Sequence, residues 1–298
     1  TLQLHHDSSN TGVDKLIVSG GSISGDGAIV KTGGAYFDIA WSNPSGDILD
    51  SFDGLIDVDQ GTLAVNTRGN SNNGGVAGSG NADLDIASGA TFDLRSGDFK
   101  IDALDGSGTI ENSSGVGNTL SIGNNDGSGT FSGNITQVDA DAFDLVKNGS
   151  GTQTLSGANA YTGTTTINAG TLAIGANMTM GAFTGTGNLS IGNGITLTAN
   201  ASSTNTFAGV VIGSGSLTKN GTGTLTLSAT NTYSGTTTIN AGTIQISAAG
   251  RLGAGSYAQN ITNNGTLIYS GTNAQTLSGI ISGGAGGTLT KEIGRAHV

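Results

Sequence analysis

The sequence predicts an all-β protein, a single-stranded right-handed parallel β-helix (β-solenoid), and three observations lead to this prediction. The chain of 298 residues contains 54 glycines, one proline and no cysteine. Its apolar residues alternate with polar ones in short runs, which is the period of a strand with one buried face. A long block headed by Lys147 returns, headed by Lys219, and a fixed period of this kind is typical of solenoid proteins.

The composition excludes several classes of protein. Glycine does not recur at every third position with abundant proline, which excludes collagen. The absence of cysteine excludes a disulfide scaffold. No stretch approaches the roughly 20 apolar residues that a membrane-spanning helix requires. Glycine, threonine, asparagine and serine favour strands and turns over helix interiors, so we expect many short strands.

The charge is distributed unevenly along the chain. Residues 1–144 contain 20 acidic and five basic residues, a net charge of −15, whereas residues 145–291 contain four basic residues and no carboxylate side chain. Neither portion is basic enough for a nucleic-acid partner, and the acidic portion would repel phosphates and anionic lipids. We interpret the acidic portion as a solvated surface, with binding of a cation or a basic partner as the alternative.

The repeat is read directly from a self-comparison of the sequence. Residues 147–156 align with 219–228, and residues 159–174 align without a gap with 231–246, at an offset of 72 throughout. A third copy begins at Leu289-Thr290-Lys291, which stands at the same offset from Leu217-Thr218-Lys219. Looser relatives precede these copies, so the repeat is expected to run through the whole chain.

One copy of the repeat predicts strand, turn, strand, turn, strand. Its inward-facing apolar residues are listed in chain order as Leu225, Leu227, Ile239, Ile244 and Ile246. Turns are expected at Asn231, Gly235 and Ala241-Gly242, because glycine and asparagine tolerate positive φ. Stacked coils would bury the apolar face. Since such coils take about 20 to 25 residues, one repeat is expected to fill about three of them.

Two positions carry specific expectations. Gln153 occupies the place of Leu225, and a buried amide is costly unless it is hydrogen-bonded. Gln153 therefore has a polar partner, or its coil is locally loose. In the acidic portion, Phe37, Ile39 and Trp41 alternate with polar or small residues before residues 43–46, which predicts a strand that leads into a larger loop.

These observations divide the chain into three segments. Residues 1–145 are expected to form acidic, degenerate β-helix coils with longer loops, and residues 146–291 the regular 72-residue repeats. Residues 292–298 can be encoded by a common sequencing adapter, and the repeat fails where they begin, so we expect them to be non-native. A secretory signal is expected to lie outside this chain.

The block at residues 147–174, returning at 219–246, resembles the passenger-associated repeat of bacterial autotransporters, the type V secreted proteins. This resemblance implies a β-helical passenger segment at the cell surface or outer membrane, or secreted, in a Gram-negative bacterium. It implies a stalk or scaffold that aids folding and secretion. The implied partner is a carboxy-terminal outer-membrane β-barrel of the same protein, and the absence of cysteine is compatible with threading through that barrel.

Motifs for catalysis and metal binding are weak. Residues 21–25 around Ser24 resemble the nucleophile-elbow pattern only in part, because Ile23 stands at its central position, and glycine and serine are so frequent that such a resemblance is expected by chance. His5 and His6 precede Asp7 without further metal ligands. Residues 78–83 resemble one calcium-binding nonapeptide, which requires tandem copies. We therefore expect no catalytic, cofactor-binding or metal-ligating residue and no cofactor.

Two alternative functions stay open. An adhesin module would bind host or bacterial surface glycans or proteins through loops of the acidic portion. A polysaccharide-cleaving enzyme would use a carboxylate pair such as Asp83 and Asp85, which lie on one strand face. The threonine sets at 164–166 and 236–238 occur only once in each copy of the repeat, so they do not predict the threonine array of an ice-binding surface.

Overall fold

The computed structural model describes residues 1–5, 14–18, 23–41, 49, 51–66, 76–77, 80–113, 117–138 and 142–292. In these ranges the regular structure is almost entirely strand, and the one helix is the 3₁₀ turn η1 (Gly253–Gly255). The strands pair in parallel with strands of the preceding and following coils. The predicted all-β parallel β-solenoid is confirmed. No helix in the described ranges has the length and hydropathy needed to cross a membrane.

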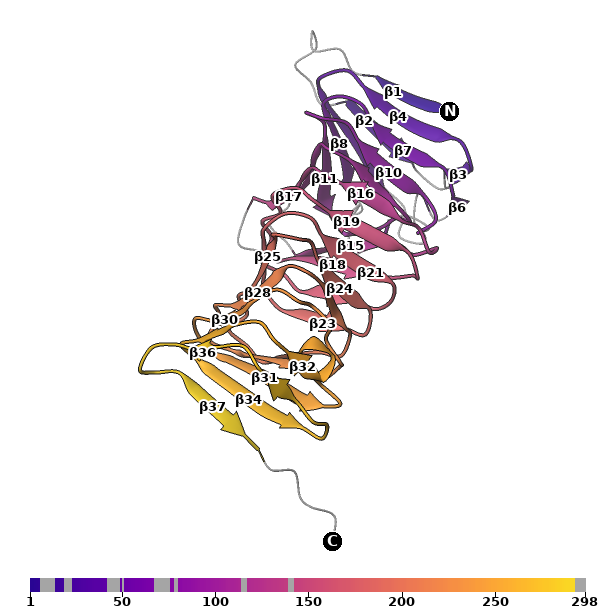
Figure 1. The fold of residues 1–298 in the computed structure, drawn as a ribbon. Helices are drawn as coiled ribbons and strands as arrows, with labels where there is room; N and C mark the ends of the chain where they lie inside the picture. Colours follow the sequence, from indigo (N-terminus) through magenta and orange to yellow (C-terminus); the bar gives the residue numbers. More distant parts are fainter. Residues whose placement is uncertain are drawn as a thin grey trace. The chain divides into compact units, whose positions relative to one another are not determined.

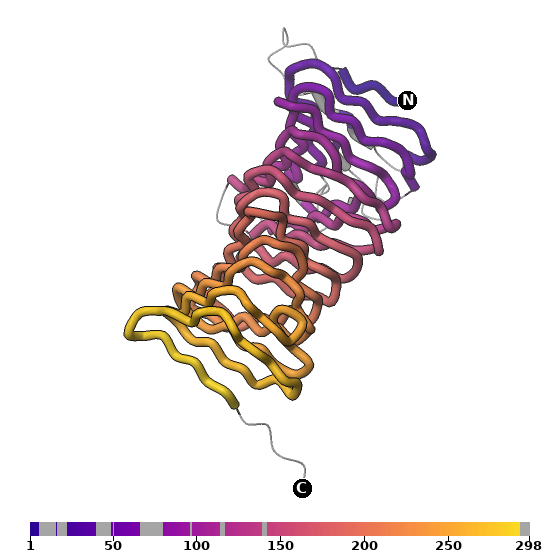
Figure 2. Tube along the Cα trace, viewed as in Figure 1, coloured from indigo at the N-terminus to yellow at the C-terminus, as the bar shows by residue number. Residues whose placement is uncertain are grey.

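The chain divides into two compact units, Thr1–Thr162 and Gly163–Val298. Within each unit the chain winds through successive coils, which Figure 2 traces along the Cα atoms. The boundary predicted from charge and repeat regularity, between residues 145 and 146, stays a prediction.

Strands of the first unit form three sets, each of which takes one strand from each coil (Figure 1). The first set is β1 (Leu2–His5), β4 (Ala28–Thr32), β7 (Leu55–Val58), β10 (Asp83–Ile86), β13 (Leu104–Gly106), β16 (Gly129–Phe131) and β19 (Thr152–Leu155). The second is β2 (Asp14–Val18), β5 (Tyr36–Trp41), β8 (Thr62–Asn66), β11 (Thr91–Ser96), β14 (Thr109–Asn112) and β17 (Asn134–Gln137). The third comprises β3 (Ser24–Gly25) paired with β6 (Ser51–Phe52), then β9 (Val76–Ala77), β12 (Asp98–Lys100), β15 (Asn118–Ile122) and β18 (Phe143–Lys147).

Strands of the second unit follow the same rule. One set is β20 (Thr165–Ile167), β23 (Phe183–Gly185), β26 (Asn205–Phe207), β29 (Thr224–Leu227), β31 (Thr243–Ala248), β34 (Thr266–Gly271) and β37 (Thr288–Lys291). Another is β22 (Met178–Met180), β25 (Thr196–Ala199), β28 (Ser216–Lys219), β30 (Thr237–Ile239), β33 (Ile261–Asn263) and β36 (Ile281–Ser282). The remaining strands are β21 (Thr171–Ile174), β24 (Asn188–Ile191) and β27 (Val211–Gly213), and β32 (Ser256–Tyr257) with β35 (Thr276–Leu277).

The core follows the predicted alternation. The five apolar residues expected to face inward, Leu225, Leu227, Ile239, Ile244 and Ile246, are all buried. The polar residues between them are partly exposed, as the burial patterns of β29 and β31 show. Because each coil covers the next, the apolar faces form one continuous column of contacts within each unit.

The interval between copies of the repeat is longer than three coils. In the second unit, successive pairings lead from Ile167 through Gly185 and Phe207 to Leu227, so three coils end well before Ile239. The remaining residues carry the chain to the next face. Ile239, which corresponds to Ile167 in the repeat, therefore lies in a different sheet. One repeat therefore fills three coils and one further face of the next coil, which is one face more than the three coils expected from the sequence.

Gln153 has polar partners, which decides between the two alternatives drawn from the sequence. Its side chain is fully buried. Its Oε1 accepts from the backbone N–H of Leu104 at 3.2 Å, and its Nε2 donates to the Leu104 carbonyl at 2.8 Å. Gly129 is the register partner of Gln153, and because Gly129 has no side chain, the amide reaches the coil beyond it. The amide thus supplies backbone-like hydrogen bonds that this part of the sheet would otherwise lack.

The predicted strand in the acidic portion is β5, where Phe37 and Ile39 are buried. The larger loop expected at residues 43–46 lies outside the described residues. So do residues 293–298 of the suspected non-native tail, which stays a prediction.

Candidate functional site

The lysine that heads each repeat lies inside the solenoid. Lys147 and Lys219 are 1% and 0% exposed, and Lys31, the last residue of a segment (28–31) that resembles residues 216–219, is also 0% exposed. Each occupies the last inward-facing position of its strand. The predicted alternation of apolar residues does not reveal these buried lysines, although Lys219 stands two residues after Leu217 and therefore on the same face of its strand.

Each lysine ammonium binds at least one carbonyl oxygen of the turn that follows it, and those of Lys31 and Lys219 also bind a carbonyl of an adjacent coil. Lys31 Nζ donates to the Thr32, Gly33 and Gln60 carbonyls at 2.9, 2.6 and 3.0 Å. Lys147 Nζ donates to the carbonyls of Asn148 and Gly149. Lys219 Nζ donates to those of Gly221 and Ala201.

These contacts give the buried lysines a structural role. Burial lowers the pKa of all three, and for Lys147 the charges of Asp126 and Asp102 partly oppose this shift. Because turn carbonyls buried without a donor would cost free energy, the ammonium groups stabilise the turns, and those of Lys31 and Lys219 also join a turn to an adjacent coil.

One face of each repeat is closed by side chains in place of a strand. Asn231 is fully buried between β29 and β30. Its Oδ1 accepts from Val211 N at 2.9 Å, and its Nδ2 donates to the Ala229 and Arg251 carbonyls at 2.8 and 3.1 Å. This amide bridges three coils, whereas the sequence pattern predicts only a turn at Asn231.

The first copy of the repeat uses the same arrangement. Asn159 is 7% exposed, and its Oδ1 accepts from the backbone N–H of Ile135 at 3.0 Å. Two positions later in each copy stands a buried tyrosine, Tyr161 or Tyr233. The recurring Asn-x-Tyr triplet was the sequence signal for this closure.

The second copy of the repeat pairs with itself. β28 pairs with β30, with Lys219 opposite Ile239, and β29 pairs with β31, with Leu225 opposite Ile244. Partners are therefore separated by the length of a single coil. The second repeat therefore supplies two neighbouring strands to each of two sheets. These strands form hydrogen bonds with one another, so the repeat provides many of its own pairing partners.

Among the described residues, the structure does not bring the weak catalytic motif and the weak metal-binding motif together into one site. Ser24 lies exposed on β3, opposite Ser51. Ring nitrogen Nδ1 of His5 lies 2.9 Å from Thr32 Oγ1, while His6 and Asp7 lie outside the described residues. No group of three or more potential metal ligands occurs in the described ranges.

The calcium-like segment uses its polar groups within the fold. Asn81 Nδ2 donates to Asp53 Oδ1 at 2.9 Å, and Asp83 Oδ1 accepts from Ala103 N at 3.0 Å. Gly78 and Ser79 lie outside the described residues.

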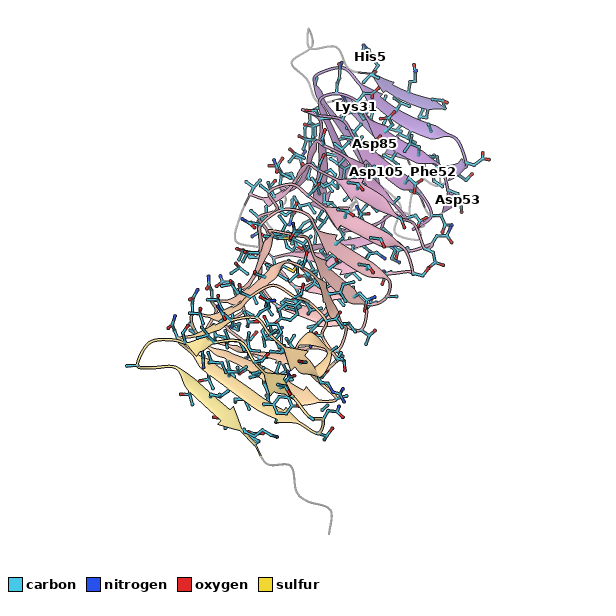
Figure 3. All side chains as sticks on the ribbon, viewed as in Figure 1. His5, Lys31, Phe52, Asp53, Asp85 and Asp105 are labelled. Atoms are coloured by element: carbon cyan, nitrogen blue, oxygen red, sulfur yellow. The ribbon has the colours of Figure 1, made fainter. Side chains whose placement is uncertain are left out.

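Asp83 and Asp85 share one exposed strand face, as expected from their spacing. Asp85 is in register with Asp57 on one side and Asp105 on the other, so three carboxylates form a column on successive coils. Figure 3 labels Asp85 and Asp105 on the neighbouring strands β10 and β13. Burial, followed by the charges of Asp59 and Asp85, raises the pKa of Asp57.

Threonines outside the two triplets align with Thr238 of the second triplet on successive coils. Thr198, Thr218, Thr238 and Thr262 are register partners in the second unit. The triplets alone had indicated no regular array, because the threonines from intervening coils have no fixed spacing in the sequence.

Comparison with known proteins identifies the repeat. Residues 145–174 and 217–246 match the family model of the passenger-associated transport repeat. The chain is similar to the Adhesin BmaC autotransporter of Brucella suis biovar 1 (strain 1330), with 33% identity over 210 residues. That match covers 51% of this chain and 6% of the relative, so the chain spans a small part of the length of the curated relative it matches. No solved structure matches the chain.

These matches confirm the resemblance stated from the sequence. The chain carries the repeat of autotransporter passengers, and its two copies coincide with the lysine-headed blocks. Both matches indicate a surface or extracellular location in a Gram-negative bacterium.

Proposed function

We propose that this segment of an autotransporter passenger is a non-enzymatic stalk that helps the passenger to fold and to be secreted across the outer membrane. The observation that carries this proposal is the self-pairing of the second repeat, β28 with β30 and β29 with β31. A solenoid stalk of this kind would hold a more distal functional region away from the cell.

The self-pairing supports a role in folding for a physical reason. A strand whose partner stands one coil away in the chain closes a short loop, and short loops cost little conformational entropy. Such a repeat can form its ladder as soon as it has left a pore. Its partner during secretion would be the carboxy-terminal β-barrel of the same protein. Coils that have folded outside the cell would be too wide to move back through the pore of that barrel.

Surface display of the whole chain ahead of an autotransporter β-barrel tests this proposal. Asn159→Leu combined with Asn231→Leu breaks the side-chain closure of both repeats and should lower the fraction of passenger that protease can reach on intact cells. Asn168→Leu with Asn240→Leu is the matched control, because both of these asparagines are exposed. Equal display of the two variants would contradict the role in secretion.

An adhesive contact is the second candidate function, and it is favoured by the similarity to an autotransporter adhesin. Loops of residues 1–145 would contact host or bacterial surface glycans or proteins. A glycan array probed with the whole chain, and with a chain that lacks residues 1–130, tests it. Binding that survives the deletion would place the contact elsewhere.

Polysaccharide cleavage is the remaining alternative. The proposal predicts no turnover of polysaccharides by the purified chain. Turnover that disappears in Asp83→Asn or Asp85→Asn would contradict the non-enzymatic role and assign these carboxylates to catalysis.

A further inference from the structure

One coil of the second unit is longer than its neighbours. The step along the chain between the register partners Thr237 and Ile261 is longer than the step from Leu217 to Thr237 or from Ile261 to Ile281. The longer coil contains η1 and β32, which lie side by side in Figure 1. In the described part of the chain β32 pairs with β35 of the following coil and with no strand of the preceding one.

A cavity of about 270 Å³ lies where that rung is missing. Its walls are Thr232–Ser234 from one coil, and Gly253, Ala254 and residues 256–259 from the next. The volume is just below the range of about 300–1,000 Å³ that is usual for ligand pockets. The cavity therefore suits a single small ring and not an extended ligand.

The walls are held rigidly. Ala254 has a left-handed backbone, φ 54° and ψ 23°, which is strained for a residue other than glycine. Its N–H donates to the Asn231 carbonyl at 2.9 Å. Behind the wall, Thr237 Oγ1 lies 2.6 Å from the hydroxyl of Tyr233 and 2.7 Å from that of Tyr257. A cavity fixed in this way loses little entropy when a ligand binds.

The lining is uncharged and mostly apolar, with a small number of polar side chains. Its exposed polar side chains are the hydroxyls of Thr232, Ser234 and Ser256 and the amide of Gln259. Arg251 is not among the lining residues. Residues 145–291 contain no carboxylate side chain. A mostly apolar wall with a few hydroxyl and amide groups fits a neutral ring that has both an apolar face and hydroxyl groups.

We propose that this cavity binds one neutral pyranose residue of a glycan. The site would place a sugar contact in the regular repeats and not in the acidic loops. The proposal rests on the adhesive function only for the source of the glycan, because the sugar contact itself follows from the cavity.

Saturation-transfer NMR on the purified whole chain tests the proposal, with glucose, galactose, mannose and N-acetylglucosamine as neutral probes and glucuronate and sialic acid as charged ones. At least one neutral sugar should receive saturation, and the charged sugars should not. Ser256→Trp fills the cavity and should abolish the signal. Ser202→Trp, at an exposed serine of the same unit, is the matched control and should keep it.

Gln259→Leu keeps the volume of the side chain and removes its amide, so it should weaken binding by about five- to tenfold. This variant decides the matter if Ser256→Trp does not fold, which circular dichroism would reveal. Absence of any neutral-sugar signal, a preference for the charged sugars, or unchanged binding in Gln259→Leu would overturn the proposal. A chain that binds the sugar but does not adhere to cells would refute the adhesive function and leave the sugar site standing.

Discussion

At the scale of single residues, buried polar side chains replace missing strand-to-strand hydrogen bonds. Gln153 binds both backbone groups of Leu104, and Asn231 binds three coils at once. In each case an amide offers one donor group and one acceptor, as a peptide unit does. Sequence reasoning recognised the cost of burying Gln153 but treated Asn231 as a turn residue, because asparagine at a surface turn and asparagine in a closed core look alike in sequence.

Asn231→Leu should lower the free energy of unfolding by about 1–3 kcal/mol, because the backbone N–H of Val211 is left buried without a partner. Asn240→Leu should change it by less than about 0.5 kcal/mol, since that side chain is exposed. Urea denaturation of both variants measures the difference. Equal stability of the two would contradict the bridging role.

Gln153→Leu makes the first repeat more like the second, where Leu225 occupies this place. Consensus reasoning predicts a more stable protein, whereas the structure predicts a loss of about 1–3 kcal/mol because both backbone groups of Leu104 lose their partner. Chemical denaturation distinguishes these outcomes, and a gain in stability would show that the Gln153 contacts contribute nothing.

The raised pKa of Asp57 predicts that the stability of the first unit depends on pH. Its pKa is raised above the ordinary 3.8 by burial and by neighbouring carboxylates, so the folded state disfavours the ionised form. This penalty is present in full near neutral pH and is relieved as the pH falls through the raised pKa toward 3.8. Asp57→Asn should therefore raise the melting temperature at neutral pH, and the advantage should vanish once the pH is below the ordinary pKa. An advantage that persists at low pH would point to a cause other than ionisation.

At the scale of elements, strands and turns follow the sequence closely. The alternation of Leu225 with Leu227 and of Ile244 with Ile246 predicts β29 and β31, because one buried face forces a period of two. The turn expected at Ala241-Gly242 is confirmed, with Gly242 at φ 67°. What the elements do not reveal is which strand stacks on which, since that depends on coil length, and coil length varies with every turn.

Gly242→Ala should destabilise the second unit by more than the roughly 1 kcal/mol of a positive φ alone. A Cβ at this position would lie 2.3 Å from the Gly221 carbonyl oxygen, so the backbone of the neighbouring coil must move. Gly194→Ala has a similar φ of 72° but no atom within 4 Å, and it isolates the conformational cost. Equal losses in thermal unfolding would show that close stacking of the coils is not what selects glycine here.

At the scale of the whole molecule, the two kinds of surface expected from the charge pattern follow the chain. Carboxylates gather in residues 1–144, where Asp57, Asp85 and Asp105 align on successive coils, while residues 145–291 present hydroxyls and amides. The repeat was visible from the sequence as a constant interval. Its change of sheet from one copy to the next was not, because identical blocks can occupy any face of a coil whose faces are alike.

The second repeat stacks on itself with partners one coil apart. The chain has no cysteine, so Thr218→Cys with Thr238→Cys introduces a single pair of thiols at register partners, within the Cα separation of about 4.4–6.8 Å that a disulfide spans. Mild oxidation should join this pair rapidly and leave Thr218→Cys with Thr262→Cys, two coils apart, unjoined. Rapid closure of the distant pair, or failure of the near pair in the folded protein, would contradict the account.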